Sequence, residues 1–131
     1  MRVSFRYDPG EVPKRKHGWS KPQAGFVRRG KALIGKCPKG FSLSLAQRLL
    51  DGGIHDRGPR DPASHPRRIY AVHAGVLYRL VPTEAGKSYH GFPEAPQEFF
   101  LLDDALKDGI RSLARRLGQE KELDRWLSRR W

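Results

Sequence analysis

The stretch that decides the fold is residues 68–92, which read RIYAVHAGVLYRLVPTEAGKSYHGF. Runs rich in Ile, Val, Tyr and Leu predict three strands, at residues 68–73, 76–81 and 88–92. Ala74-Gly75 is a two-residue connection between the first two runs, and residues 83–86 supply a second turn. Because connections this short join antiparallel neighbours, we expect a three-stranded antiparallel β-meander.

Apolar residues at helical spacing lie on both sides of this segment. A short helix is expected to begin near Ser42 or Ser44, where Ser44 and Gln47 have the spacing of a capping box. A second helical region is expected from Asp103, a suitable N-cap, to the C-terminus, with an interruption at Gly118. The sequence thus predicts an α+β fold in which the meander packs against one or two C-terminal helices.

The first 30 residues show no sustained hydrophobic period and are broken by prolines and glycines. We therefore expect a basic, irregular N-terminal arm at residues 1–30 and a single compact domain at residues 31–131. No apolar run approaches the roughly 20 residues that span a bilayer. The first residues also lack the apolar core of a secretory signal. We expect a cytoplasmic protein with no membrane partner.

Positive charge is concentrated at the N-terminal end of the chain. The first 39 residues hold eleven Lys or Arg against two acids, Asp8 and Glu11, and so carry +9 of the total formal charge of +12. A polyanion is the simplest partner for such a segment, because each neutralised phosphate releases condensed counterions. Aromatic residues interleaved with the cations suit stacking on the bases of a single strand.

The residues expected to contact nucleic acid are ten cations and aromatics of this basic segment. They are Lys14, Arg15, Lys16, Trp19, Lys21, Arg28, Arg29, Lys31, Lys36 and Lys39. An alternative interpretation is that the aromatic rings pin the arm to the core of the domain.

The meander also suggests a candidate catalytic group. If its second turn centres between residues 84 and 85, Arg79 lies opposite His90 and shares a sheet face with Tyr70. This face is only partly apolar, and we expect it to be partly open. The opposite face, with Ile69 and Tyr78 among its residues, is nearly all apolar and is assigned to the core. Histidine can exchange a proton near neutral pH, and a neighbouring guanidinium can bind a phosphate. His90, Arg79 and Tyr70 are therefore the candidate catalytic residues for metal-independent RNA cleavage, and a purely structural role for them is the alternative.

Other kinds of site have little support in the sequence. Cys37 is the only cysteine, which excludes an intramolecular disulfide, and a small buried apolar residue is its simplest interpretation. The chain has no Gly-rich phosphate loop followed by Lys-Ser/Thr, no HExxH pair and no GxSxG. We expect neither a metal nor a cofactor.

The combined expectation is a small basic protein directed at nucleic acid, with RNA favoured over DNA. A metal-independent, toxin-like ribonuclease acting through His90 and Arg79 is one form of this expectation. A non-catalytic nucleic-acid-binding or ribonucleoprotein module is the second. The third is an interaction module that binds an acidic protein partner, and the sequence leaves open whether the protein is an enzyme.

Overall fold

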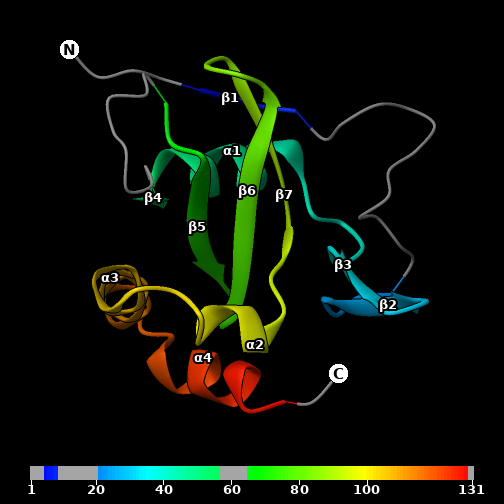
Figure 1. Ribbon diagram of the computed structural model, residues 1–131, viewed down its shortest axis with the longest axis vertical. Helices are drawn as coiled ribbons and strands as arrows, with labels where there is room; N and C mark the ends of the chain where they lie inside the picture. The colour runs from blue at the N-terminus through cyan, green and yellow to red at the C-terminus, as the bar shows by residue number, and fades with distance from the viewer. Residues whose placement is uncertain (1–4, 9–20, 57–64, 130–131) are drawn as a thin grey trace.

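The computed structural model of the protein describes residues 5–8, 21–56 and 65–129. The architecture is α+β, as the sequence predicted. A five-stranded sheet has the strand order β1-β7-β6-β5-β4, and β2 and β3 form a separate two-stranded sheet. Figure 1 shows the sheet at the centre, the helices packed around it, and the β2–β3 hairpin standing to one side.

The predicted meander forms the centre of the five-stranded sheet as β5 (Arg68–His73), β6 (Val76–Glu84) and β7 (Ser88–Pro93). Neighbouring strands in it are antiparallel. Its first turn is the predicted Ala74-Gly75 pair, with φ values of 50° and 77°. Positive φ at both central residues is what a two-residue hairpin turn of type I′ requires.

The predicted pairing of β6 with β7 was wrong by two residues. Arg79 faces Phe92 and His90 faces Val81, because β6 continues through Pro82 to Glu84 with a bulge between those two residues. A shift by an even number of residues leaves every side chain on its original sheet face. Arg79 and His90 therefore still share one face.

Two short strands that the sequence did not predict extend the sheet at its edges. β4 (Ile54–Asp56) pairs antiparallel with β5, and β1 (Arg6–Tyr7) pairs parallel with β7. The side chain of Gln47 supports β1 by accepting from the Tyr7 N–H and donating to the Phe5 carbonyl, at 2.8 Å each. Part of the predicted arm is thus a strand of the sheet.

The short predicted helix is α1 (Leu43–Asp51). Its N-cap is Ser42, whose hydroxyl accepts from the Leu45 N–H at 3.1 Å. The capping box predicted for Ser44 and Gln47 was therefore wrong, because the Gln47 amide is used across the fold on β1.

Three helices follow the meander: α2 (Pro96–Phe99), α3 (Asp104–Arg116) and α4 (Glu120–Leu127). Asp103 caps α3 as predicted, accepting from the Leu106 N–H at 2.8 Å. Gly118, with φ of 70°, lies between α3 and α4 at the predicted interruption. The sequence did not predict α2.

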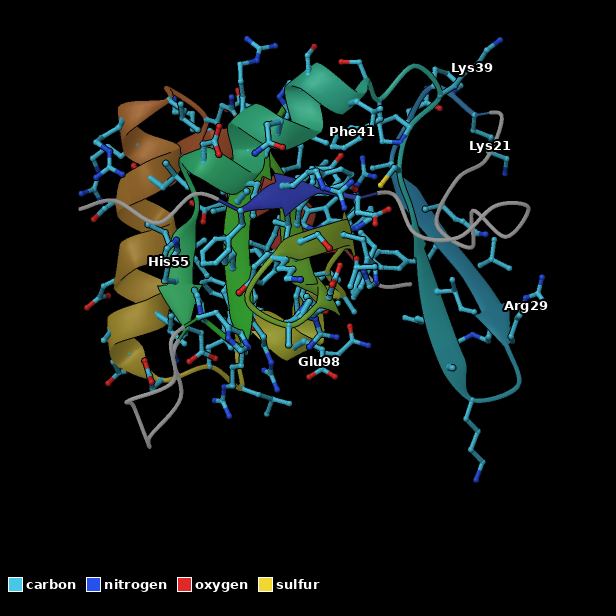
Figure 2. The ribbon with its side chains drawn as sticks, turned by 90° about the horizontal axis from the view of Figure 1, so that it is seen from above. Lys21, Arg29, Lys39, Phe41, His55 and Glu98 are labelled. Carbon is cyan, nitrogen blue, oxygen red and sulfur yellow. The ribbon has the colours of Figure 1, made fainter. Side chains whose placement is uncertain are left out.

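Both faces of the sheet are buried, each under different helices. The face with Ile69, Tyr78 and Tyr89 packs beneath α1, as part of the predicted core. The C-terminal helices instead cover the face that we expected to be partly open, where Tyr70 and Leu77 are fully buried. Figure 2, seen from above, places α1 and α2 on opposite sides of the sheet. The expectation of a partly open face was wrong except around Arg79, His90 and Phe92, which stay partly exposed.

The β2–β3 hairpin combines β2 (Gly25–Arg29) with β3 (Ala32–Lys36), and the predicted boundary at residue 30 falls at its turn. Two contacts seat the hairpin on the body of the molecule. Phe26 packs against Trp126 of α4 with ring centroids 5.7 Å apart. Gly35 lies so close to β7 that a Cβ there would overlap the Pro93 carbonyl oxygen. The hairpin is thus fixed beside the exposed end of the sheet.

Candidate nucleic-acid interface

A cleft separates the β2–β3 hairpin from the middle of β6, the C-terminal half of β7 and α2. We call it the hairpin cleft, and its volume is about 580 Å³. It is lined by residues of these elements: Phe26, Arg28, Lys31, Ala32, Leu33, Ile34, Gly35, Arg79, His90, Phe92, Pro93, Glu94, Ala95, Gln97 and Glu98. Figure 2 shows the hairpin standing beside the body of the molecule, with Glu98 on the body and Arg29 on the hairpin.

The hairpin wall of this cleft is basic. Arg28 from β2 and Lys31 from the turn line the cleft, and both side chains are exposed. Successive residues of a strand point to opposite faces. Arg29, one residue further on and outside the cleft lining, therefore extends the positive surface over the outer side of the hairpin.

The sheet wall brings two of the predicted catalytic residues to one aromatic ring. The Arg79 guanidinium carbon lies 5.3 Å from the centroid of the Phe92 ring. The His90 ring lies beside the same phenyl group, tilted by 49° with a centroid distance of 6.4 Å. The Thr83 hydroxyl lies 2.6 Å from His90 Nδ1 and orients the imidazole. This wall therefore offers a cation, a proton-transfer group and a stacking surface within one patch.

A buried carboxyl group that the sequence reasoning missed lies at the end of this wall. The side chain of Glu94 is 4% exposed, and its Oε2 lies 3.1 Å from Arg79 Nε. The two atoms form an ion pair without hydrogen-bond alignment. Glu94 Oε1 accepts from the Ala95 N–H at 3.2 Å. Burial raises the pKa of Glu94 and outweighs the opposing effect of Arg79.

The sequence did hold a signal for Glu94. His90, Phe92 and Glu94 are two residues apart along one strand and its extension, so they fall on one side of the sheet. A search for acids that continued this spacing past Pro93 would have found the carboxyl group.

Tyr70, the third predicted catalytic residue, lies away from the hairpin cleft. It is fully buried beneath α3 and α4 and is not among the residues that line the cleft. Burial raises the pKa of its hydroxyl, and the neighbouring Arg68 guanidinium acts in the opposite direction. Tyr70 is thus a core residue that cannot touch a ligand in the cleft.

Of the remaining predicted binding residues, three lie in the described part of the chain and four lie outside it. Lys21 and Lys39 lie at the root of the hairpin, where the Lys39 N–H donates to the Lys21 carbonyl at 2.7 Å (Figure 2). Lys36 ends β3 and is half-buried. The other four predicted residues lie outside the described residues: Lys14, Arg15, Lys16 and Trp19.

Cys37 has the structural role that was its simplest interpretation. It is 9% exposed, and its Sγ lies 3.7 Å from the Gly91 carbonyl oxygen. Burial raises the pKa of the thiol to about 12. A thiol that stays protonated at neutral pH is a poor nucleophile.

Comparisons with protein-family models, with curated proteins and with solved structures found no match. Across residues 5–8, 21–56 and 65–129, His, Cys, Asp and Glu side chains do not gather in any group of three that could hold a metal. None of the helices in this part of the chain is both long and apolar enough to cross a membrane.

Proposed function

We propose that this protein binds single-stranded nucleic acid, with RNA favoured over DNA, in the hairpin cleft. One observation carries the proposal: the basic hairpin wall, with Arg28 and Lys31, lies across the cleft from the aromatic ring of Phe92. Cations that hold the backbone beside an aromatic group that stacks on bases are the usual elements of single-strand recognition.

The charges of the cleft set the orientation of the strand. On the body side Glu94 is paired with Arg79 and Glu98 is exposed, so this wall has no excess of positive charge. Phosphates are therefore attracted to Arg28 and Lys31 on the hairpin side. The bases then face Phe92, which offers stacking. Gln97 and Glu98 offer polar groups to the edges of the bases, as unstacked RNA bases require.

The size of the cleft favours a single strand over a duplex. A volume of about 580 Å³ lies within the range of small-molecule sites, roughly 300–1,000 Å³. One or two nucleotides fit such a space, whereas a duplex would meet only its rim.

The test is fluorescence anisotropy with a labelled single-stranded RNA, comparing wild type with Arg28→Gln/Lys31→Gln. Each lost phosphate contact should reduce the slope of log K against log salt by about 0.7. The matched control is Arg116→Gln/Lys121→Gln, which removes the same charge from exposed positions on α3 and α4.

The expected result is a weaker and less salt-dependent affinity for the cleft variant, with the control close to wild type. Equal losses of RNA affinity in both variants would show that binding depends on net charge alone and not on the cleft. An absence of RNA binding at moderate salt would refute the proposal and leave the acidic protein partner as the alternative.

A second candidate function is metal-independent RNA cleavage in the same cleft. The specific observation in its favour is that Thr83 orients His90 within the patch that also holds Arg79 and Glu94. His90 would take the proton of a 2′-hydroxyl, whose oxygen then attacks the adjacent phosphorus. Arg79 would stabilise the charge on the phosphorane, and Glu94 would protonate the 5′-oxygen that leaves.

Incubation of total bacterial RNA with the protein in EDTA tests this second candidate. Discrete fragments from wild type that are lost with both His90→Ala and Glu94→Gln would support cleavage. RNA that stays intact while the protein binds it would reject catalysis and leave binding alone.

A further inference from the structure

A second groove lies at the root of the hairpin, against the turn between β5 and β6. We call it the turn groove, and its volume is about 460 Å³. Its walls come from residues 22–24 before β2, residues 38–41 after β3, the Ala74-Gly75 turn and the outer surface of α4. It shares no lining residue with the hairpin cleft, so it is a separate site.

The rim of the turn groove is cationic. Lys39, Arg125 and Arg129 line it, and Glu122 is the carboxylate among the lining residues. Arg129 also lies over the Trp126 ring, with its guanidinium carbon 5.9 Å from the centroid. The end of α4 contributes the negative pole of a helix dipole, equivalent to about half a charge. The excess of full positive charges outweighs this pole, so the groove favours an anion.

The floor of the turn groove is aromatic. Phe41 is half-buried and stacks on Tyr78 with a centroid distance of 5.2 Å and an interplanar angle of 28°. The His73 ring meets Phe41 nearly edge-on at 6.5 Å. Tyr78 and Trp126 are almost fully buried, so Phe41 and His73 present the accessible ring surface. A planar ring placed on Phe41 would extend an existing stack.

His73 adds a polar group that can form a hydrogen bond with an uncharged part of a ligand. Burial, assisted by the charge of Arg48, lowers the pKa of this imidazole. The ring is therefore neutral at pH 7, when it can both donate and accept a hydrogen bond. The groove thus combines cations for an anionic group with a ring surface and a hydrogen-bonding edge.

We propose that the turn groove binds a nucleotide, with Lys39 and Arg125 on its phosphate and Phe41 against its base. A free nucleoside monophosphate and the phosphorylated end of an RNA strand share this chemistry. Recognition of the first source does not depend on the hairpin cleft, whereas the second source would place the end of a bound strand in the turn groove.

Isothermal titration calorimetry with adenosine 5′-monophosphate tests the proposal. Saturable binding is expected, at least tenfold weaker with Arg125→Gln, and weaker for adenosine, which lacks the phosphate. Arg125 is an exposed helix residue, so its replacement should leave the fold intact. Arg116→Gln, which removes an arginine from outside the groove, is the matched control. Binding that is absent, or unchanged in Arg125→Gln, would overturn the proposal.

Two further experiments are needed. The first distinguishes a free nucleotide from the end of an RNA strand, and the second distinguishes the turn groove from the hairpin cleft. An RNA oligonucleotide with a 5′-phosphate should bind more tightly than its unphosphorylated form, and only in proteins that retain Arg125, if the occupant is a strand end. Equal affinity of the two oligonucleotides identifies the free nucleotide as the occupant. Arg28→Gln/Lys31→Gln should weaken RNA binding and leave adenosine 5′-monophosphate binding unchanged, so failure of one site is distinguished from failure of the other.

Discussion

Replacement of Gly35 by alanine should loosen the hairpin from the sheet. A Cβ at this position would overlap the Pro93 carbonyl oxygen and lie 3.2 Å from the carbonyl carbon and Cδ of the same residue. The nearest of these atoms belong to the backbone of β7, so no side-chain rotation can relieve the overlap. The hairpin must therefore move away from β7 by about 1 Å to restore a normal contact.

The loss of unfolding free energy in Gly35→Ala is the balance of two effects, overpacking in the native state and reduced chain entropy in the unfolded state. Forcing an extra methyl group into a packed contact costs about 1–3 kcal/mol. Replacing glycine by alanine returns about 0.4–1 kcal/mol by restricting the unfolded chain. The overlap dominates, and we expect Gly35→Ala to lose about 1–2 kcal/mol of unfolding free energy. Because the hairpin wall carries Arg28 and Lys31, RNA affinity should fall several-fold as well.

Urea denaturation and RNA anisotropy on the same preparations measure both effects. The matched control is Gly52→Ala, since Gly52 has φ of −100° and its added Cβ would meet only the Arg48 carbonyl oxygen, at 3.5 Å. The control should be as stable as wild type or slightly more stable. If Gly35→Ala is as stable as wild type and binds RNA equally well, the seating of the hairpin on β7 is wrong.

Three further predictions concern buried polar groups. Cys37, whose pKa burial raises to about 12, should resist iodoacetamide at pH 8 until the protein is unfolded, and rapid native-state alkylation would contradict its burial. Tyr7→Phe should cost about 1–3 kcal/mol in urea denaturation, because the Tyr7 hydroxyl accepts from the Gly91 N–H at 3.1 Å and its loss leaves a buried donor without an acceptor. An unchanged midpoint would remove that hydrogen bond from the account. Burial raises the pKa of Glu94, so the native state binds the proton of this carboxyl group more tightly than the unfolded state does. The resulting stabilisation is fully present below the ordinary glutamate pKa and is lost as pH rises through the raised pKa. Stability against pH should therefore decline across that window in wild type and less in Glu94→Gln, and parallel profiles would contradict the shift.

The central strands could be predicted from the sequence because their signals are local. β5 has the predicted bounds Arg68–His73, since an apolar run ends at a two-residue turn whose residues adopt positive φ. Asp103 likewise marks the start of α3 through a side chain that caps the helix three residues on.

The edges of the fold could not be predicted because their causes are distant in the sequence. β1 is two residues long and pairs with β7 through residues 88 and 89, so no periodicity reveals it. The bulge between Pro82 and Glu84 shifted the pairing of β6 with β7, and a proline within a strand gave no indication of how far the strand continues. Helix packing covered both faces of the sheet, which no local sequence signal indicated.

The candidate site was predicted in part for a geometrical reason. Arg79 and His90 remained on one face because the register error was even. Tyr70 is the cross-strand partner of Arg79 on that face, but it belongs to β5, the strand that α3 covers, and so it is buried under the helices. The hairpin wall of the cleft could not be predicted, because its place depends on where the hairpin packs against the sheet. The close approach of Gly35 to Pro93 fixes that place, and no sequence pattern reveals it.

The most direct test of the central claim is photo-cross-linking of a 4-thiouridine-containing single-stranded RNA, followed by identification of the modified peptides. Binding in the hairpin cleft predicts cross-links to the peptides that contain Phe92 and Phe26, and their loss with Arg28→Gln/Lys31→Gln. Cross-links confined to the outer surfaces of α3 and α4, and unaffected by that variant, would contradict the assignment of the cleft.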